Sequence, residues 1–91
     1  MATTAVTLTA SGIVSSKPCR LYTAHIKAGS SAGSVSLRNG TTGSDDVLDQ
    51  VGDSGGGAWL QYTWHGLTFS KGLYATVTNT AQVTLEIEPL G

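Results

Sequence analysis

Apolar and polar residues alternate along most of this chain, and this period of two is the feature that most restricts its fold. The alternation is cleanest in four segments, 6–9, 34–38, 73–78 and 83–88. Successive side chains of a strand point to opposite faces, so each segment would have one apolar face and one polar face. This pattern is typical of an antiparallel sheet with one face buried and the other in water.

Three further segments, 19–27, 47–51 and 58–64, have a less regular strand pattern. We interpret 47–51 as an edge strand. In 19–27, strict alternation would place these four residues on one face: Arg20, Tyr22, Ala24 and Ile26. In 58–64 it would place Leu60 with Tyr62 and Trp64 and would direct Trp59 to the opposite side.

Turn-forming residues separate these segments, with Gly, Asn and Ser concentrated in 29–33, 39–43, 52–57 and 79–80. Gly and Asn accept the positive φ that tight hairpin turns require. No window has capped helical periodicity, so no substantial helix is expected. The sequence predicts an all-β fold, a single antiparallel β-sandwich or small jelly roll of seven to eight strands. We expect one domain over residues 1–91, with 1–4 as a candidate N-terminal arm.

Charged residues make up only 12% of the chain, and the formal net charge is −1. The usual share in soluble domains is about 25%. The five Lys and Arg residues are scattered, which argues against a nucleic-acid partner. No apolar run is long enough for a membrane span. A polar surface with few charges instead favours association with other protein chains.

Cys19 is the only cysteine, so the chain has no internal disulfide and no paired-cysteine zinc motif. We interpret it as a half-buried, small apolar side chain. The N-terminal residues do not have the charged and apolar regions of a signal peptide, so synthesis in a reducing cytoplasm is expected.

No motif predicts catalysis, and we expect neither an enzyme nor a cofactor or metal site. His25 and His65 have no acidic or cysteine neighbour at metal-ligand spacing. The four aspartates between 45 and 53 do not have the spacing of an EF-hand loop. The glycine-rich loop 53–57 lacks the Lys-Ser/Thr ending of a P-loop and precedes no helix.

The aromatic segment 59–69 is the most informative candidate site. An outward Trp59 would be a good anchor at a protein interface, because large aromatic side chains contribute much of the binding energy there. Two other interpretations remain open at this point. Trp59 could lie in the core at a bulge, or it could form an aromatic platform that stacks on a carbohydrate.

Taken together, the chain resembles the small β-sandwich structural proteins of tailed bacteriophages, among them capsid decoration (cement) proteins. The resemblance covers most of the length and rests on segments 5–11, 20–29, 35–40, 69–78 and 83–84. It implies a virion structural protein on the capsid surface, made in the host cytoplasm, which binds the major capsid protein and itself, for example as a homotrimer.

Two alternative functions remain beside capsid decoration. One is a tail, neck or fibre-attachment component of the virion, and the other is a small carbohydrate-binding module that uses Trp59 or Tyr22. The candidate interface residues are Tyr22, Trp59, His65, Thr3 and Thr4.

Overall fold

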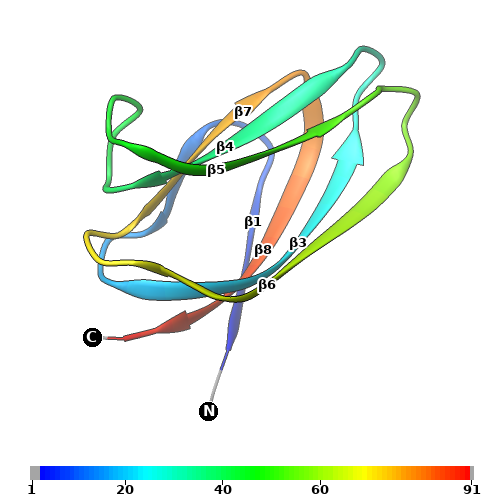
Figure 1. Ribbon diagram of the computed structural model, residues 1–91. Helices are drawn as coiled ribbons and strands as arrows, with labels where there is room; N and C mark the ends of the chain where they lie inside the picture. The colour runs from blue at the N-terminus through cyan, green and yellow to red at the C-terminus, as the bar shows by residue number, and fades with distance from the viewer. Residues whose placement is uncertain (1–2, 91) are drawn as a thin grey trace.

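The computed structural model describes residues 3–90, and every regular element within them is a β-strand. The eight strands are β1 (Thr4–Leu8), β2 (Gly12–Ser15), β3 (Cys19–Ala28), β4 (Gly33–Asn39), β5 (Val47–Asp53), β6 (Trp59–Phe69), β7 (Leu73–Thr78) and β8 (Thr80–Pro89) (Figure 1). No helix occurs in this part of the chain, and hence no helix that could cross a membrane. The predicted all-β class and strand number are confirmed.

The strands form two antiparallel four-stranded sheets that pack against each other. Sheet A has the order β1-β8-β3-β6, and sheet B has the order β2-β7-β4-β5. Four strand pairs are nested along the chain, since β4 pairs with β5, β3 with β6, β2 with β7 and β1 with β8. The chain therefore forms one long hairpin that is rolled up, and the rolling adds the pairs β3·β8 and β4·β7. This arrangement is a jelly roll, one of the two topologies that the alternation had left open.

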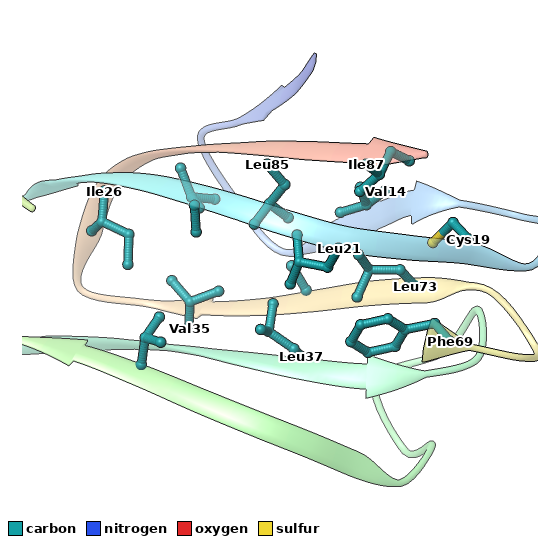
Figure 2. Close-up of a cluster of buried hydrophobic side chains, with 14 residues drawn as sticks. Val14, Cys19, Leu21, Ile26, Val35, Leu37, Phe69, Leu73, Leu85 and Ile87 are labelled. Atoms are coloured by element: carbon teal, nitrogen blue, oxygen red, sulfur yellow. The ribbon is translucent and has the colours of Figure 1, made fainter. Parts of the chain in front are cut away.

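The core lies between the sheets and consists of the apolar faces of the alternating segments. Figure 2 shows Leu21 and Leu85 of sheet A directed toward Leu37 of sheet B, and all three side chains are fully buried. Phe69 is the largest fully buried side chain. Burying one such side chain contributes about 1.5–3 kcal/mol, so this core is the main stabilising feature of a small domain.

Strand β3 departs from strict alternation at a bulge beside Tyr22. Relative to β8, the register skips one residue of β3 between Leu21 and Thr23. Leu21 is buried before the bulge and Ala24 is buried after it. The predicted face shared by Arg20, Tyr22, Ala24 and Ile26 is therefore wrong, because the extra residue reverses the alternation.

Strand β6 has a larger irregularity at the same level of the sheet. Leu21 pairs with Leu67 and Thr23 pairs with Thr63, so β6 holds two more residues than β3 in this interval. Gly66 lies in the interval with a φ of +88°, a conformation that residues with a Cβ rarely adopt. The irregularity lets Trp64 and Leu67, three residues apart, both pack against the core.

Candidate interface

Trp59 is the most exposed large apolar side chain among residues 3–90, with 59% of its surface accessible. It begins β6 and lies directly opposite Lys27 of β3. The Lys27 Nζ is 5.9 Å from the centroid of the Trp59 ring system, within the range of a cation–π interaction. The ring thus lies exposed on the surface of sheet A beside the Lys27 ammonium group. The interpretation of Trp59 as a core residue is therefore wrong.

The loop before Trp59, residues 54–58, is attached to the loop after β3. The Gly57 N–H donates to the Gly29 carbonyl at 3.2 Å, and the Ala28 N–H donates to the Ala58 carbonyl at 2.8 Å. Gly55, Gly56 and Gly57 all have positive φ, which explains why this segment is so rich in glycine. We call Trp59, Lys27 and residues 54–58 the Trp59 corner.

Asp53 fixes the base of the Trp59 corner. Its Oδ1 accepts hydrogen bonds from the N–H groups of Gly33 and Gly55, at 3.2 and 3.0 Å. Its Oδ2 accepts a 3.0 Å hydrogen bond from the hydroxyl of Thr80, which is buried. One carboxylate thus joins the start of β4, the loop after β5 and the start of β8. No sequence motif singles out this aspartate, which is the last of the four between 45 and 53 and the first residue of the glycine-rich loop 53–57.

Tyr22 and His65 lie toward the other end of sheet A. The Tyr22 hydroxyl donates to Oε1 of Glu88 at 3.0 Å, and the same carboxylate oxygen lies 3.6 Å from the Arg20 guanidinium. Tyr22 is half-buried, whereas His65 is exposed in the irregular part of β6. Tyr22 is five residues from Lys27 along β3, roughly 16 Å at the rise of a strand. Tyr22 and Trp59 therefore do not form one continuous site.

Thr3 and Thr4 lie at the free edge of sheet A. Thr4 is the first residue of β1 and pairs with Ile87 of β8, and Thr3 precedes it as an exposed residue. The first two residues of the predicted arm, Met1 and Ala2, lie outside the described residues. Thr4 itself belongs to the sheet.

The outer face of sheet B carries apolar residues that alternation alone did not predict. Four paired residues run across the four strands in the order Ile13, Tyr74, Arg38 and Val47, which we call the sheet B row. Ile13 is 50% exposed and Val47 is 44% exposed, and Leu48 beside them is 42% exposed. Adjacent apolar residues such as Ile13-Val14 and Val47-Leu48 were the available signal, because an ordinary strand buries only one of two neighbours.

The Arg38 side chain in this row is held in place by neutral groups. Its Nε donates to the Thr76 hydroxyl at 2.8 Å, and its Nη1 donates to the Asp45 carbonyl at 2.9 Å. The Asp45 carboxylate in turn accepts hydrogen bonds from the N–H and hydroxyl of Thr42 and from the N–H of Thr41. These bonds, chiefly the one from the Thr42 N–H, hold the pKa of Asp45 below its usual value. Hydrogen bonds thus fix the positions of the Arg38 guanidinium and of the Asp45 carboxylate at this end of the row.

Neither a pocket nor a group of three or more potential metal-ligating side chains occurs within residues 3–90. The candidate functional surfaces are the Trp59 corner and the sheet B row, because both expose large apolar side chains. Comparison with family models, with curated proteins and with solved structures gave no match to this chain.

Proposed function

We propose that this protein is a virion structural protein, and specifically a capsid decoration protein that stabilises the lattice of the major capsid protein. The observation that carries the proposal is the exposure of large apolar side chains on the outer faces of both sheets. Trp59 lies outside sheet A, and Ile13 and Val47 lie outside sheet B. A thin sandwich with exposed apolar side chains on each outer face can contact two neighbouring proteins at once.

The physical properties of the two surfaces support a role in protein association. Aromatic side chains and arginine are enriched among the residues that dominate binding energy, and the surfaces contain Trp59, Tyr74 and Arg38. The Arg38 side chain is already fixed by two hydrogen bonds, so little of its conformational freedom would be lost on binding. Few charges would have to be desolvated, because the whole chain has only 12% charged residues.

Resemblance to small phage structural proteins supplies the particular assembly in the proposal. The jelly-roll topology is compatible with it, since viral capsid domains use this fold. Lectin domains and cupins use it as well, so the fold by itself does not select a function. In the proposed role, the domain binds across neighbouring capsid subunits and adds buried surface at their joints.

The direct test is binding of the purified protein to expanded phage capsids that lack a decoration protein. We expect the protein to sediment with these capsids and to raise the temperature at which they release their DNA or fall apart. Trp59→Ala and Ile13→Ser should each weaken binding by about tenfold or more, as expected for residues at the centre of an interface. Gln61→Ala is the matched control, because Gln61 is exposed on β6 but outside both surfaces.

The proposal fails if the wild-type protein neither binds such capsids nor raises their stability. Binding that is unchanged in both the Trp59→Ala and the Ile13→Ser variants would contradict the assignment of the surfaces. Immunogold labelling of intact virions separates a head location from the alternative tail, neck or fibre-attachment role.

A carbohydrate-binding module is the second candidate function, and the exposed ring of Trp59 favours it. Sugar rings stack on exposed aromatic faces, and 59% of the Trp59 surface is accessible. A glycan array probed with the wild-type protein and with Trp59→Ala tests this function. Binding that depends on Trp59 would favour it over capsid decoration, and an array without signal would remove it.

A further inference from the structure

The jelly roll leaves four strands at the sheet edges, and the register of three of them is interrupted by a break. These are β2 and β5 in sheet B and β6 in sheet A. Strand β2 has only four residues, and its register is broken between Ile13 and Ser15. Strand β5 has a break opposite Leu37 and Arg38, and β6 contains the irregularity at Gly66. Short length and bulges are the usual means of blocking edge-to-edge association.

Strands β5 and β6 are also joined to each other across the sandwich. The Tyr62 hydroxyl of β6 donates to the Gly52 carbonyl of β5. The Trp64 indole N–H of β6 donates to the Asp49 carboxylate of β5 at 2.7 Å. Side chains of β6 are thus hydrogen-bonded to β5, and these bonds restrain both edge strands.

Strand β1 is also short, with five residues, but it is the one edge strand among residues 3–90 whose register has no break. It pairs with β8 without a break from Thr4 to Leu8, and no described strand pairs with its other side. Its sequence, Thr-Ala-Val-Thr-Leu, contains no charge, no proline and no glycine. In an antiparallel sheet an edge strand leaves about half of its backbone N–H and C=O groups without a strand partner.

We infer that β1 pairs antiparallel with β1 of a second copy of this chain, around a two-fold axis at Val6. This pairing joins the two A sheets into one eight-stranded sheet. Val6 faces Val6 of the second copy, and Ala5 faces Thr7 of the second copy. The half-buried Val6 and Leu8, which already pack against the core, become more deeply covered.

A second copy is the occupant that the charges on this edge permit. Like charges that face each other across a strand pair are destabilising, and β1 brings none to the dyad. The nearest acidic residue is Glu86, which lies beside Ala5 on β8. The two Glu86 residues are separated by three strand spacings, about 14 Å, which exceeds the screening length at physiological salt. Repulsion between like charges therefore does not oppose the symmetric pairing of two β1 strands.

The dimer should be weak, because five paired residues on each side form an interface at the small end of the known range. We expect sedimentation equilibrium of the full chain to show a mass that rises with concentration from 9.3 kDa toward twice that value. Ala5→Lys should lower the association constant by about tenfold or more, since the two lysines would lie about 7–8 Å apart diagonally across the axis.

We expect the Ala5→Lys variant to fold like the wild type, because Ala5 is exposed and the new lysine lies opposite Glu86 within its own chain. Gln61→Lys is the matched control, with the same charge change at an exposed position on the opposite edge strand of sheet A. It should dimerise like the wild type. A wild-type mass that stays monomeric up to the solubility limit would overturn the inference, and so would a trimer or equal dimerisation of Ala5→Lys.

Disulfide trapping tests the register independently. In a mixture of Ala5→Cys and Thr7→Cys chains, the two cysteines face each other at about 4.5–5.5 Å between Cα atoms, within disulfide range. Each variant alone places its cysteines diagonally at about 7–8 Å, beyond that range. Oxidation should therefore give covalent dimers in the mixture and far fewer in either variant alone. Equal cross-linking in all three samples would contradict the register. Because β1 is separate from the Trp59 corner and the sheet B row, Ala5→Lys also shows whether capsid binding depends on this pairing.

Discussion

The indole N–H of Trp64 donates a 2.7 Å hydrogen bond to Oδ2 of Asp49, and this bond joins the edge of one sheet to the edge of the other. Oδ1 of the same carboxylate accepts a hydrogen bond from the Gln50 N–H. Both residues are half-buried, so the bond is partly shielded from water. It also explains how two tryptophans five residues apart have opposite roles, since Trp64 closes the sandwich while Trp59 remains on its surface.

Replacing Trp64 with Phe should lower the free energy of unfolding by about 1–3 kcal/mol, because Oδ2 of Asp49 loses the indole donor in a half-buried position. Urea denaturation followed by circular dichroism measures the change. Trp59→Phe is the control and should stay within about 0.5 kcal/mol of the wild type, since its ring is exposed. Equal effects of the two substitutions would contradict the assigned role of the hydrogen bond.

Gly33 occupies a position where a side chain has no room. A Cβ there would lie 2.5 Å from the backbone oxygen of Thr78 and 2.7 Å from Oγ1 of Thr80. Gly33→Ala should therefore destabilise the fold by about 1–3 kcal/mol through overpacking. Gly43→Ala should be nearly neutral, because its Cβ would meet only the Tyr74 ring at 3.6 Å. Thermal unfolding of the two variants compares them directly, and a Gly33→Ala protein as stable as Gly43→Ala would refute this packing argument.

Cys19 is completely buried, which is deeper than the half-buried position predicted from the sequence. Burial raises the pKa of its thiol, and a side-chain hydrogen bond with Ser15 offsets this only in part. A thiol reagent should therefore react with the native protein no faster than the protein unfolds. An exposed cysteine introduced by Thr7→Cys should react at once. Fast labelling of Cys19 in the folded wild type would show that the site opens locally.

The raised pKa of Cys19 also has a consequence at alkaline pH. The folded state favours the neutral thiol, so the stabilisation is complete below the pKa of an unfolded cysteine. It is lost as the pH rises through the pKa of the folded state. The unfolding free energy of the wild type should thus fall more steeply with alkaline pH than that of Cys19→Ala. Parallel curves for the two proteins would contradict the shift.

Asp45 gives the opposite dependence in acid. Hydrogen bonds to its charged form, first that from the Thr42 N–H, lower its pKa in the folded state. Its contribution is present above the pKa of an unfolded aspartate and is lost as the pH falls through the lower pKa of the folded state. Asp45→Asn should therefore show a weaker loss of stability in acid than the wild type. Titration of the Asp45 carboxyl by NMR provides a second measurement, and a normal pKa would contradict the loop geometry.

Local alternation predicted one of the two candidate surfaces and missed the other. Alternation within 58–64 correctly predicted that Trp59 points away from Leu60, Tyr62 and Trp64. The same rule failed at Tyr22, because the extra residue in β3 is visible only in its pairing with β6 and β8. The sheet B row was also missed, since its four members come from four separate strands and become neighbours only through sheet register.

The sequence alone determined that this protein is an all-β domain with one buried face on each sheet, because a period of two and the turn residues are local properties. The pattern also indicated 47–51 as an edge strand, and β5 does lie at an edge of sheet B. It could not determine which strands pair or where the bulges fall. Those features depend on contacts between segments that are distant along the chain, such as Thr4 with Ile87 and Trp64 with Asp49. Only the tertiary structure therefore decided that the chain is a jelly roll with β1 as an edge strand of unbroken register.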